Sequence, residues 1–118
     1  MRYLLPAMLL LLSCSALTPA VMPDGVAIRF YMPEAASVQL VGDWNDWGGL
    51  TAAGGMLDPE AGAMVLGEDG FWTASPDLPR GRYRYAFLVD GRRLVRDELN
   101  PLTATWDGQT VSLRVIGD

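Results

Sequence analysis

The feature that most constrains the fold is a run over residues 82–89 in which two kinds of side chain alternate. The even-numbered positions hold Arg, Arg, Ala and Leu, and the odd-numbered positions hold Tyr83, Tyr85, Phe87 and Val89. Successive side chains of a β-strand point to opposite faces of the sheet, so this alternation predicts a strand with its aromatic face in the core. The Asp90-Gly91 pair that follows is typical of a tight turn into an antiparallel partner over 92–96.

Other short segments alternate in a similar way. They cover residues 26–32, 38–41 and 110–116, and Gly, Pro, Asn and Asp separate them. No segment keeps a helical period. Short strands joined by such turns predict an all-β protein, an antiparallel β-sandwich. The chain has 118 residues, which is enough for a single domain with one core of this kind.

The composition argues against several classes of function. The chain has no His and one Cys, so Ser–His and Cys–His nucleophilic pairs cannot form within it, and the commonest metal ligand is missing. The net charge of −5 at pH 7 argues against nucleic acid, because such partners are bound by basic surfaces. We therefore expect no metal, no cofactor and no nucleic-acid partner.

The N-terminus is typical of an export signal. Arg2 precedes an apolar run over 3–12, which is too short to span a bilayer but suits the central part of a secretory signal. The run ends in Ser13-Cys14, which resembles a bacterial lipobox, where cleavage before Cys is followed by attachment of a lipid to its thiol. This pattern predicts a signal peptide over 1–13 and a lipidated Cys14. Ordinary secretion with cleavage after Ala20 is the alternative, and the preceding Pro makes that bond a poor site.

These signals also predict the organisation and location of the protein. Residues 14–25 hold the Cys and a short tether of Pro and small residues, and the folded domain covers 26–118. We expect a lipid anchor in the bacterial cell envelope. Ser15 is not the Asp that favours inner-membrane retention in enteric bacteria, so the outer membrane is favoured. A periplasmic or secreted protein is the alternative.

Two segments together resemble a known family. The first is Val-Gln-Leu-Val-Gly-Asp-Trp-Asn-Asp-Trp at 38–47, and the second is Asp-Gly-Phe-Trp at 69–72 followed by the strand and turns at 78–91. In this order they resemble the family-48 carbohydrate-binding module, an immunoglobulin-like (early-set) β-sandwich found in glycogen-branching and debranching enzymes and in the β subunit of the AMP-activated protein kinase. The resemblance covers roughly residues 26–116. It implies an early-set sandwich that binds α-glucan.

The resemblance assigns roles to the tryptophans of the first segment. In the kinase-subunit members, a Trp at the end of the Asn-x-Trp turn forms part of the sugar platform, and Trp47 matches it. Trp44 matches a core position, so we expect Trp44 to be buried and Trp47 to lie at the surface. The second platform Trp of those members is replaced here by Arg93 or Leu94.

Further site residues follow from the same resemblance. The family's Lys on the central strand corresponds to Ala86, and Arg84, two residues earlier on the same face, is its candidate substitute as a donor. Thr110 and Ser112 resemble the polar residues of the family's last motif. Trp106 is either a relocated platform or a cap on the sandwich. The predicted carbohydrate-binding residues are therefore Trp47, Arg84, Trp106, Thr110 and Ser112.

Two further features have open interpretations. Residues 49–62 exceed the family pattern, and we expect them to be disordered or to form a local flap. Asp43 and Asp46 flank Asn45, an arrangement that suits either calcium or a turn, and turn chemistry is favoured because Asp and Asn bond their own backbone.

The sequence as a whole predicts a non-catalytic module. The catalytic barrel of the related enzymes has no counterpart in these residues, and no carboxylate pair suggests a glycosidase. Binding of an α-glucan or a related polysaccharide at the envelope is the leading hypothesis. A protein-interaction module of the envelope, which kept the fold but lost the sugar platform, is the alternative.

Overall fold

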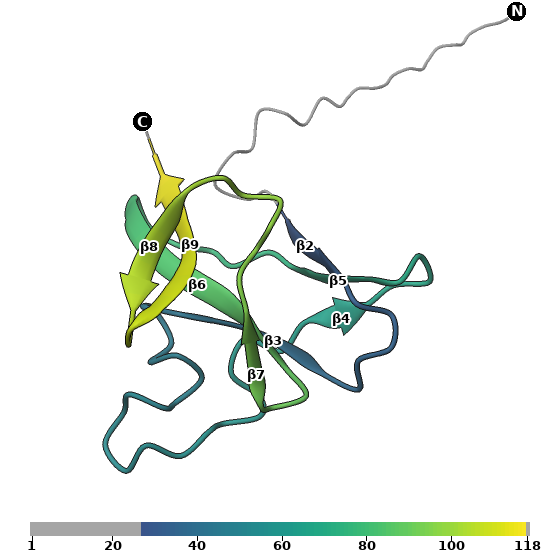
Figure 1. Ribbon diagram of the computed structural model, residues 1–118, viewed down its shortest axis with the longest axis horizontal. Helices are drawn as coiled ribbons and strands as arrows, with labels where there is room; N and C mark the ends of the chain where they lie inside the picture. The colour runs from purple at the N-terminus through teal and green to yellow at the C-terminus, as the bar shows by residue number, and fades with distance from the viewer. Residues whose placement is uncertain (1–26, 118) are drawn as a thin grey trace, which may run out of the picture.

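The computed structural model describes residues 27–117 (Figure 1). The predicted signal peptide, Cys14 and the tether lie outside the described residues. None of the described residues forms an apolar helix of membrane-spanning length.

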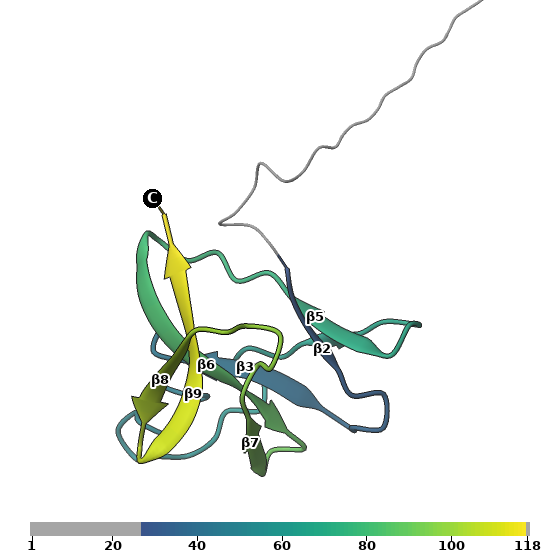
Figure 2. The same ribbon diagram turned by 45° about the horizontal axis from the view of Figure 1, so that its top comes forward.

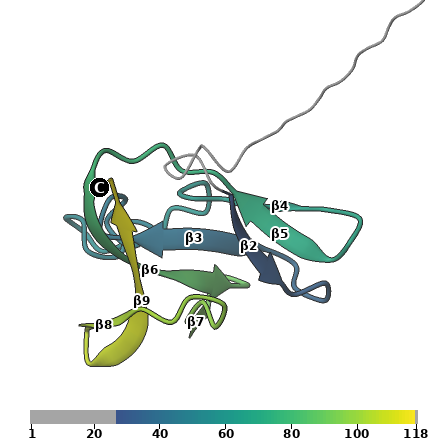
Figure 3. The ribbon, with the colours of Figure 1, turned by 90° about the horizontal axis from the view of Figure 1, so that it is seen from above.

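Every regular element in residues 27–117 is a strand, and the strands form two antiparallel sheets (Figure 1). The three-stranded sheet has the order β2-β5-β4 and the larger sheet has the order β3-β6-β9-β8, with β7 paired to the end of β6. Figure 3 shows β4 and β5 on the opposite side of the molecule from β8 and β9. The strands are β2 (Ile28–Tyr31), β3 (Val38–Gly42), β4 (Val65–Leu66), β5 (Phe71–Ala74), β6 (Gly81–Val89), β7 (Arg93–Val95), β8 (Thr103–Trp106) and β9 (Gln109–Ile116). The all-β, immunoglobulin-like antiparallel sandwich predicted from the sequence is confirmed.

The main core lies between the two sheets. The aromatic face of β6 supplies Tyr85, Phe87 and Val89, which are buried against residues of β2, β3 and β5. The Phe87 ring stacks on Phe30 with the ring centroids 4.3 Å apart. Tyr83, at the start of the strand, is only half-buried and donates its hydroxyl to a backbone carbonyl oxygen. The predicted register of this strand is therefore correct.

A second apolar cluster covers the other face of the five-stranded sheet. Ala86 and Leu88 of β6 are buried there together with Val41 and Val111. The connection between β3 and β4 supplies part of the cover through Trp47 and the partly buried Leu57, and β7 and β8 supply the rest through Leu94, Ala104 and Trp106. The alternation in β6 predicts one buried face, whereas the folded chain buries both.

In two hairpin turns both residues of an Asp-Gly pair are left-handed. Asp90 and Gly91 both adopt left-handed φ values, of 56° and 69°, and they join β6 to β7 as predicted. Asp107 and Gly108 do the same, with φ values of 51° and 76°, between β8 and β9. Figure 2 shows this second hairpin projecting from the large sheet. Strand β8 was not predicted from the sequence, because its alternation is too short to distinguish from a loop.

Candidate functional site

The turn after β3 is fixed by its own side chains. The Asn45 Oδ1 atom accepts hydrogen bonds from the amides of Gly42 (3.0 Å) and Gly48 (3.4 Å), and its Nδ2 donates to the carbonyl of Leu40 (3.0 Å). A Cβ on Gly42 would lie 2.5 Å from the carbonyl oxygen of Arg84, so only glycine fits there. The turn chemistry expected for Asn45 is therefore present.

This turn places Trp47 beneath the surface. Asp46 and Trp47 adopt left-handed φ values of 55° and 53°, which turn the chain back over the sheet. Trp47 is 2% exposed, and its Nε1 donates to the Asp43 Oδ1 atom at 3.2 Å. The expectation that Trp47 lies at the surface is wrong. The left-handed turn directs its ring onto the sheet, and such a backbone costs roughly 1–2 kcal/mol for a bulky residue.

Trp47 supports a second tryptophan. Its ring stacks on that of Trp106, with the centroids 4.0 Å apart and the planes 12° from parallel. Trp106 lies at the end of β8 and is only partly buried. It lines a surface hollow of about 430 Å³ together with Leu50, Thr51 and Asp107. Trp106 is therefore a partly exposed residue at a surface hollow, backed by the buried Trp47.

Arg84 joins this turn to β8. Its Nε and Nη2 atoms donate to the two oxygens of Asp43 at 3.1 and 3.0 Å, and its Nη1 donates to the carbonyl of Thr105 at 3.0 Å. Its backbone amide also donates to Asp43, at 2.8 Å. The guanidinium is thus positioned beside the Trp47–Trp106 stack, and its side chain is still 42% exposed.

These contacts control the ionisation of Asp43. Partial burial raises the pKa of its carboxyl group, but the hydrogen bonds from Arg84 and Trp47 and the charge of Arg84 together outweigh this effect. The pKa of Asp43 is therefore lowered from its ordinary value of 3.8. The carboxylate stays charged at neutral pH and holds both the arginine and the indole in place. No three His, Cys, Asp or Glu side chains converge as a metal site anywhere in residues 27–117.

Thr110 and Ser112 lie on the opposite face of the sheet from Trp106. In the β8–β9 register Trp106 pairs with Gln109, whereas Thr110 pairs with Thr105. Cross-strand partners share a face and successive residues alternate, so Thr110 and Ser112 point away from the tryptophan stack. Thr110 is exposed there, and Ser112 is 0% exposed. The five predicted binding residues therefore do not share one face; the structure brings together Trp47, Arg84 and Trp106 and leaves Thr110 and Ser112 apart.

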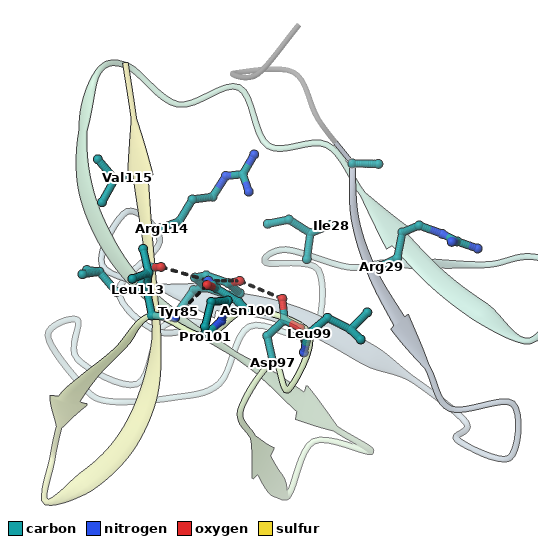
Figure 4. Close-up of a pocket in the computed structure, with 12 residues that line it drawn as sticks. Ile28, Arg29, Tyr85, Asp97, Leu99, Asn100, Pro101, Leu113, Arg114 and Val115 are labelled. Atoms are coloured by element: carbon teal, nitrogen blue, oxygen red, sulfur yellow. Dashed lines mark hydrogen bonds between the residues drawn. The ribbon is translucent and has the colours of Figure 1, made fainter. Parts of the chain in front are cut away.

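Ser112 belongs instead to a buried polar network. Its Oγ accepts a hydrogen bond from the amide of Asp97 at 2.8 Å. The Tyr85 hydroxyl donates to Asp97 at 2.7 Å and accepts from Asn100 at 3.0 Å, and Asn100 also donates to the carbonyl of Leu113. Figure 4 shows Tyr85, Asp97 and Asn100 converging in a hollow between the sheets. They fasten the connection between β7 and β8 to the sheet.

Tyr85 remains a neutral donor in this network. Burial raises the pKa of its hydroxyl, the hydrogen bond from Asn100 lowers it, and the neighbouring Asp97 raises it further. The net pKa is well above the ordinary value of 10.0. Tyr85, Asp97, Asn100 and Ser112 are joined to one another by hydrogen bonds, so we interpret this network as structural.

Three residues of the surface hollow, Leu50, Thr51 and Asp107, are not among the site residues predicted from the sequence. Leu50 and Thr51 come from the segment that exceeds the family pattern, and nothing local marks them as ligand-facing. Their position depends on how residues 48–58 fold over the sheet. The Asp-Gly pair at 107–108 was the one available signal, since it fixes the hairpin on which Trp106 lies.

Comparison with known proteins gives a partial similarity. No family model matches the sequence. Over 70 residues, or 58% of this chain, it is 37% identical to the "1,4-alpha-glucan branching enzyme GlgB" of Mycobacterium sp. strain KMS. The enzymes of that name from strains JLS and MCS match equally well. The matched region is 8% of the length of each enzyme. The chain is therefore similar to a small part of a glucan-branching enzyme.

Proposed function

We propose that this domain is a non-catalytic module that binds an α-glucan, or a related polysaccharide, through Trp106. One observation carries the proposal. The Trp106 ring is held parallel to the buried Trp47, and this partly exposed residue lines a surface hollow. The similarity to part of a glucan-branching enzyme indicates the class of ligand.

The chemistry of the hollow suits a sugar ring. The apolar face of a glucose unit would stack on the indole, as aromatic planes accept flat apolar surfaces. The hydroxyl of Thr51 and the carboxylate of Asp107 offer hydrogen-bond partners for the sugar hydroxyls. Arg84 lies beside the stack. As a donor to the sugar it would use those guanidinium N–H groups that are not bonded to Asp43 or Thr105.

The affinity expected from such a site is weak. By analogy with base–aromatic stacking, one aromatic platform contributes on the order of 1–3 kcal/mol. A single platform with few polar partners then gives a dissociation constant in roughly the high-micromolar range or weaker. Asp107 is the one carboxylate that lines the hollow, whereas glycoside hydrolysis commonly uses a pair. The site therefore favours binding without catalysis.

Retardation in a native gel that contains glycogen or amylopectin tests the proposal. The wild-type protein should be retarded, and Trp106→Ala should migrate as it does in a gel without polysaccharide. Tyr31→Ala is the matched control, because Tyr31 is an aromatic residue, 58% exposed, on the other sheet. Its retardation should equal that of the wild type.

Two outcomes would overturn the proposal. A wild-type protein that is not retarded is not an α-glucan-binding module of this kind, and the envelope interaction module then becomes the leading function. Retardation that survives Trp106→Ala would show that the sugar binds elsewhere.

We propose further that the module is exported and anchored in the cell envelope by a lipid on Cys14. The basis is the sequence around Cys14, which resembles a lipobox and follows an apolar run. A surface anchor would hold the weak binding site close to an extended polymer. The high local concentration of glucan segments would then compensate for the low affinity of the site for each segment.

A further inference from the structure

The sheet face that surrounds the proposed site is occupied by the chain itself. Val41, Ala86, Leu88 and Val111 would form a broad floor, but all four are buried in a cluster that the connection between β3 and β4 helps to cover. Figure 1 shows this connection running from the end of the β8–β9 hairpin toward β7. The packing of Trp106 at one end and Leu94 at the other on the same cluster agrees with this view.

Hydrogen bonds close the base of this connection and tie its last part to the sheet. The amide of Asp58 donates to the carbonyl of Gly48 at 2.7 Å, which closes the base of the excursion. The buried Gln39 donates its Nε2 to the carbonyls of Asp58 and Ala61 at 2.8 and 2.9 Å. The Gly62 carbonyl then accepts from the amide of Leu40 at 2.8 Å. The connection is therefore bonded to the sheet through residues 58–62, whereas residues 50–56 are exposed. The expectation for residues 49–62, disorder or a local flap, stays a prediction.

The fixed cover limits the length of polysaccharide that the face can contact. The position of the second platform in the family falls at Arg93 or Leu94; Arg93 is exposed, and Leu94 is half-buried in the cluster. The partly exposed Trp106 lies at the edge of the cover, and Leu50 and Thr51 form a wall beside it. A hollow of about 430 Å³ with such a wall lies toward the small end of ligand sites.

We infer that the site recognises a short segment of α-glucan, such as a chain end or a branch stub, and not a long chain laid across the sheet. This inference rests on the proposed function and names the part of the polymer that the same site contacts. The excursion over 49–57 then determines specificity. It keeps a long chain from lying across the sheet, and it supplies Thr51 as a contact for the short segment.

Calorimetric titration of the purified protein with maltotriose and with maltoheptaose tests this inference. Once corrected for the number of registers that the longer chain offers, the two dissociation constants should agree within about threefold. Thr51→Val should weaken both sugars by the same factor, since every bound segment uses the same wall. Met56→Ala is the matched control, because Met56 belongs to the same excursion, is 81% exposed and does not line the hollow. It should change neither constant.

The outcomes separate this inference from the proposed function. An increase in affinity of tenfold or more from maltotriose to maltoheptaose would overturn the short-segment site while leaving glucan binding intact. If Met56→Ala lost affinity for maltoheptaose alone, the short-segment site would also be overturned, because such a result would show that the longer chain contacts the exposed part of the excursion. The absence of binding to either sugar would overturn both proposals.

Discussion

At the scale of single residues, Trp47 does not have the position that the sequence suggests. The family resemblance predicts Trp47 as an exposed platform, but the left-handed backbone of the turn buries it under Trp106. Alternation rules apply to strands, and they cannot give the direction of a side chain in a turn with positive φ. For Trp106 the sequence leaves a platform and a cap open; its ring packs on the outer cluster and stacks on Trp47, and a platform role stays a proposal.

The buried position of Trp47 leads to a prediction about stability. Trp47→Ala removes a fully buried indole, its stack and its hydrogen bond to Asp43, so it should lower the free energy of unfolding by about 3–5 kcal/mol. Trp106→Ala removes a partly exposed ring, so it should lower the free energy of unfolding by less than Trp47→Ala does. Urea unfolding of both variants measures the difference. Equal losses would contradict the burial described for Trp47.

The lowered pKa of Asp43 leads to a prediction about pH. Because the pKa is depressed in the folded state, the charged carboxylate stabilises the fold above the ordinary value of 3.8, and this contribution is lost as the pH falls through the lowered folded value. Asp43→Asn should therefore be less stable than the wild type at neutral pH, and the gap should narrow in acid. Thermal unfolding midpoints measured down to and below pH 3.8 provide the test. A gap independent of pH would mean that the Asp43–Arg84 pair does not stabilise the fold through its charge.

At the scale of elements, strand β6 was predictable almost to the residue, while the cover over its outer face was not. The alternation from Tyr83 to Val89 fixed the core face because the local pattern and the tertiary burial agree. The position of residues 49–62 depends on distant partners, chiefly Gln39 and the outer face of the sheet. That Thr110 and Ser112 lie apart from Trp106 could not be predicted, because the register of β9 depends on β8, which had no clear signal.

The two faces of β6 give a paired prediction. Phe87 is 0% exposed in the main core, so Phe87→Ala should cost about 3–5 kcal/mol of unfolding free energy. Arg82 is exposed on the same strand, and Arg82→Ala should change it by less than about 0.5 kcal/mol. Chemical denaturation of the pair measures both. Similar costs for the two variants would mean that the strand is inverted.

At the scale of the whole molecule, the protein combines a single sandwich with a proposed anchor. The fold class could be predicted because the short alternating strands, the Asp-Gly turns and the family resemblance agree. The site could be predicted only in part, because it is assembled from the β3–β4 connection and the β8–β9 hairpin, which are distant in sequence.

The proposed anchor has its own test. Cys14→Ser removes the thiol that would carry the lipid, so the variant should leave the membrane fraction or accumulate as an unprocessed precursor in a bacterial host. Fractionation followed by immunoblotting measures both effects. A variant that fractionates and migrates like the wild type would rule out lipidation at Cys14.

The central claim is that sugar contacts Trp106, and the indole N–H signals of the protein test it most directly. The chain has four tryptophans, and their indole groups give separate signals in a ¹⁵N–¹H correlation spectrum once each is assigned by substitution. Trp72 is the internal control, because its Nε1 donates to the carbonyl of Met32 at 2.7 Å inside the main core. We predict that maltotriose shifts the Trp106 signal in a saturable way, shifts that of the stacked Trp47 less, and leaves that of Trp72 unchanged. A spectrum in which the Trp106 signal does not move at millimolar sugar, or in which Trp44 or Trp72 alone responds, would contradict the account.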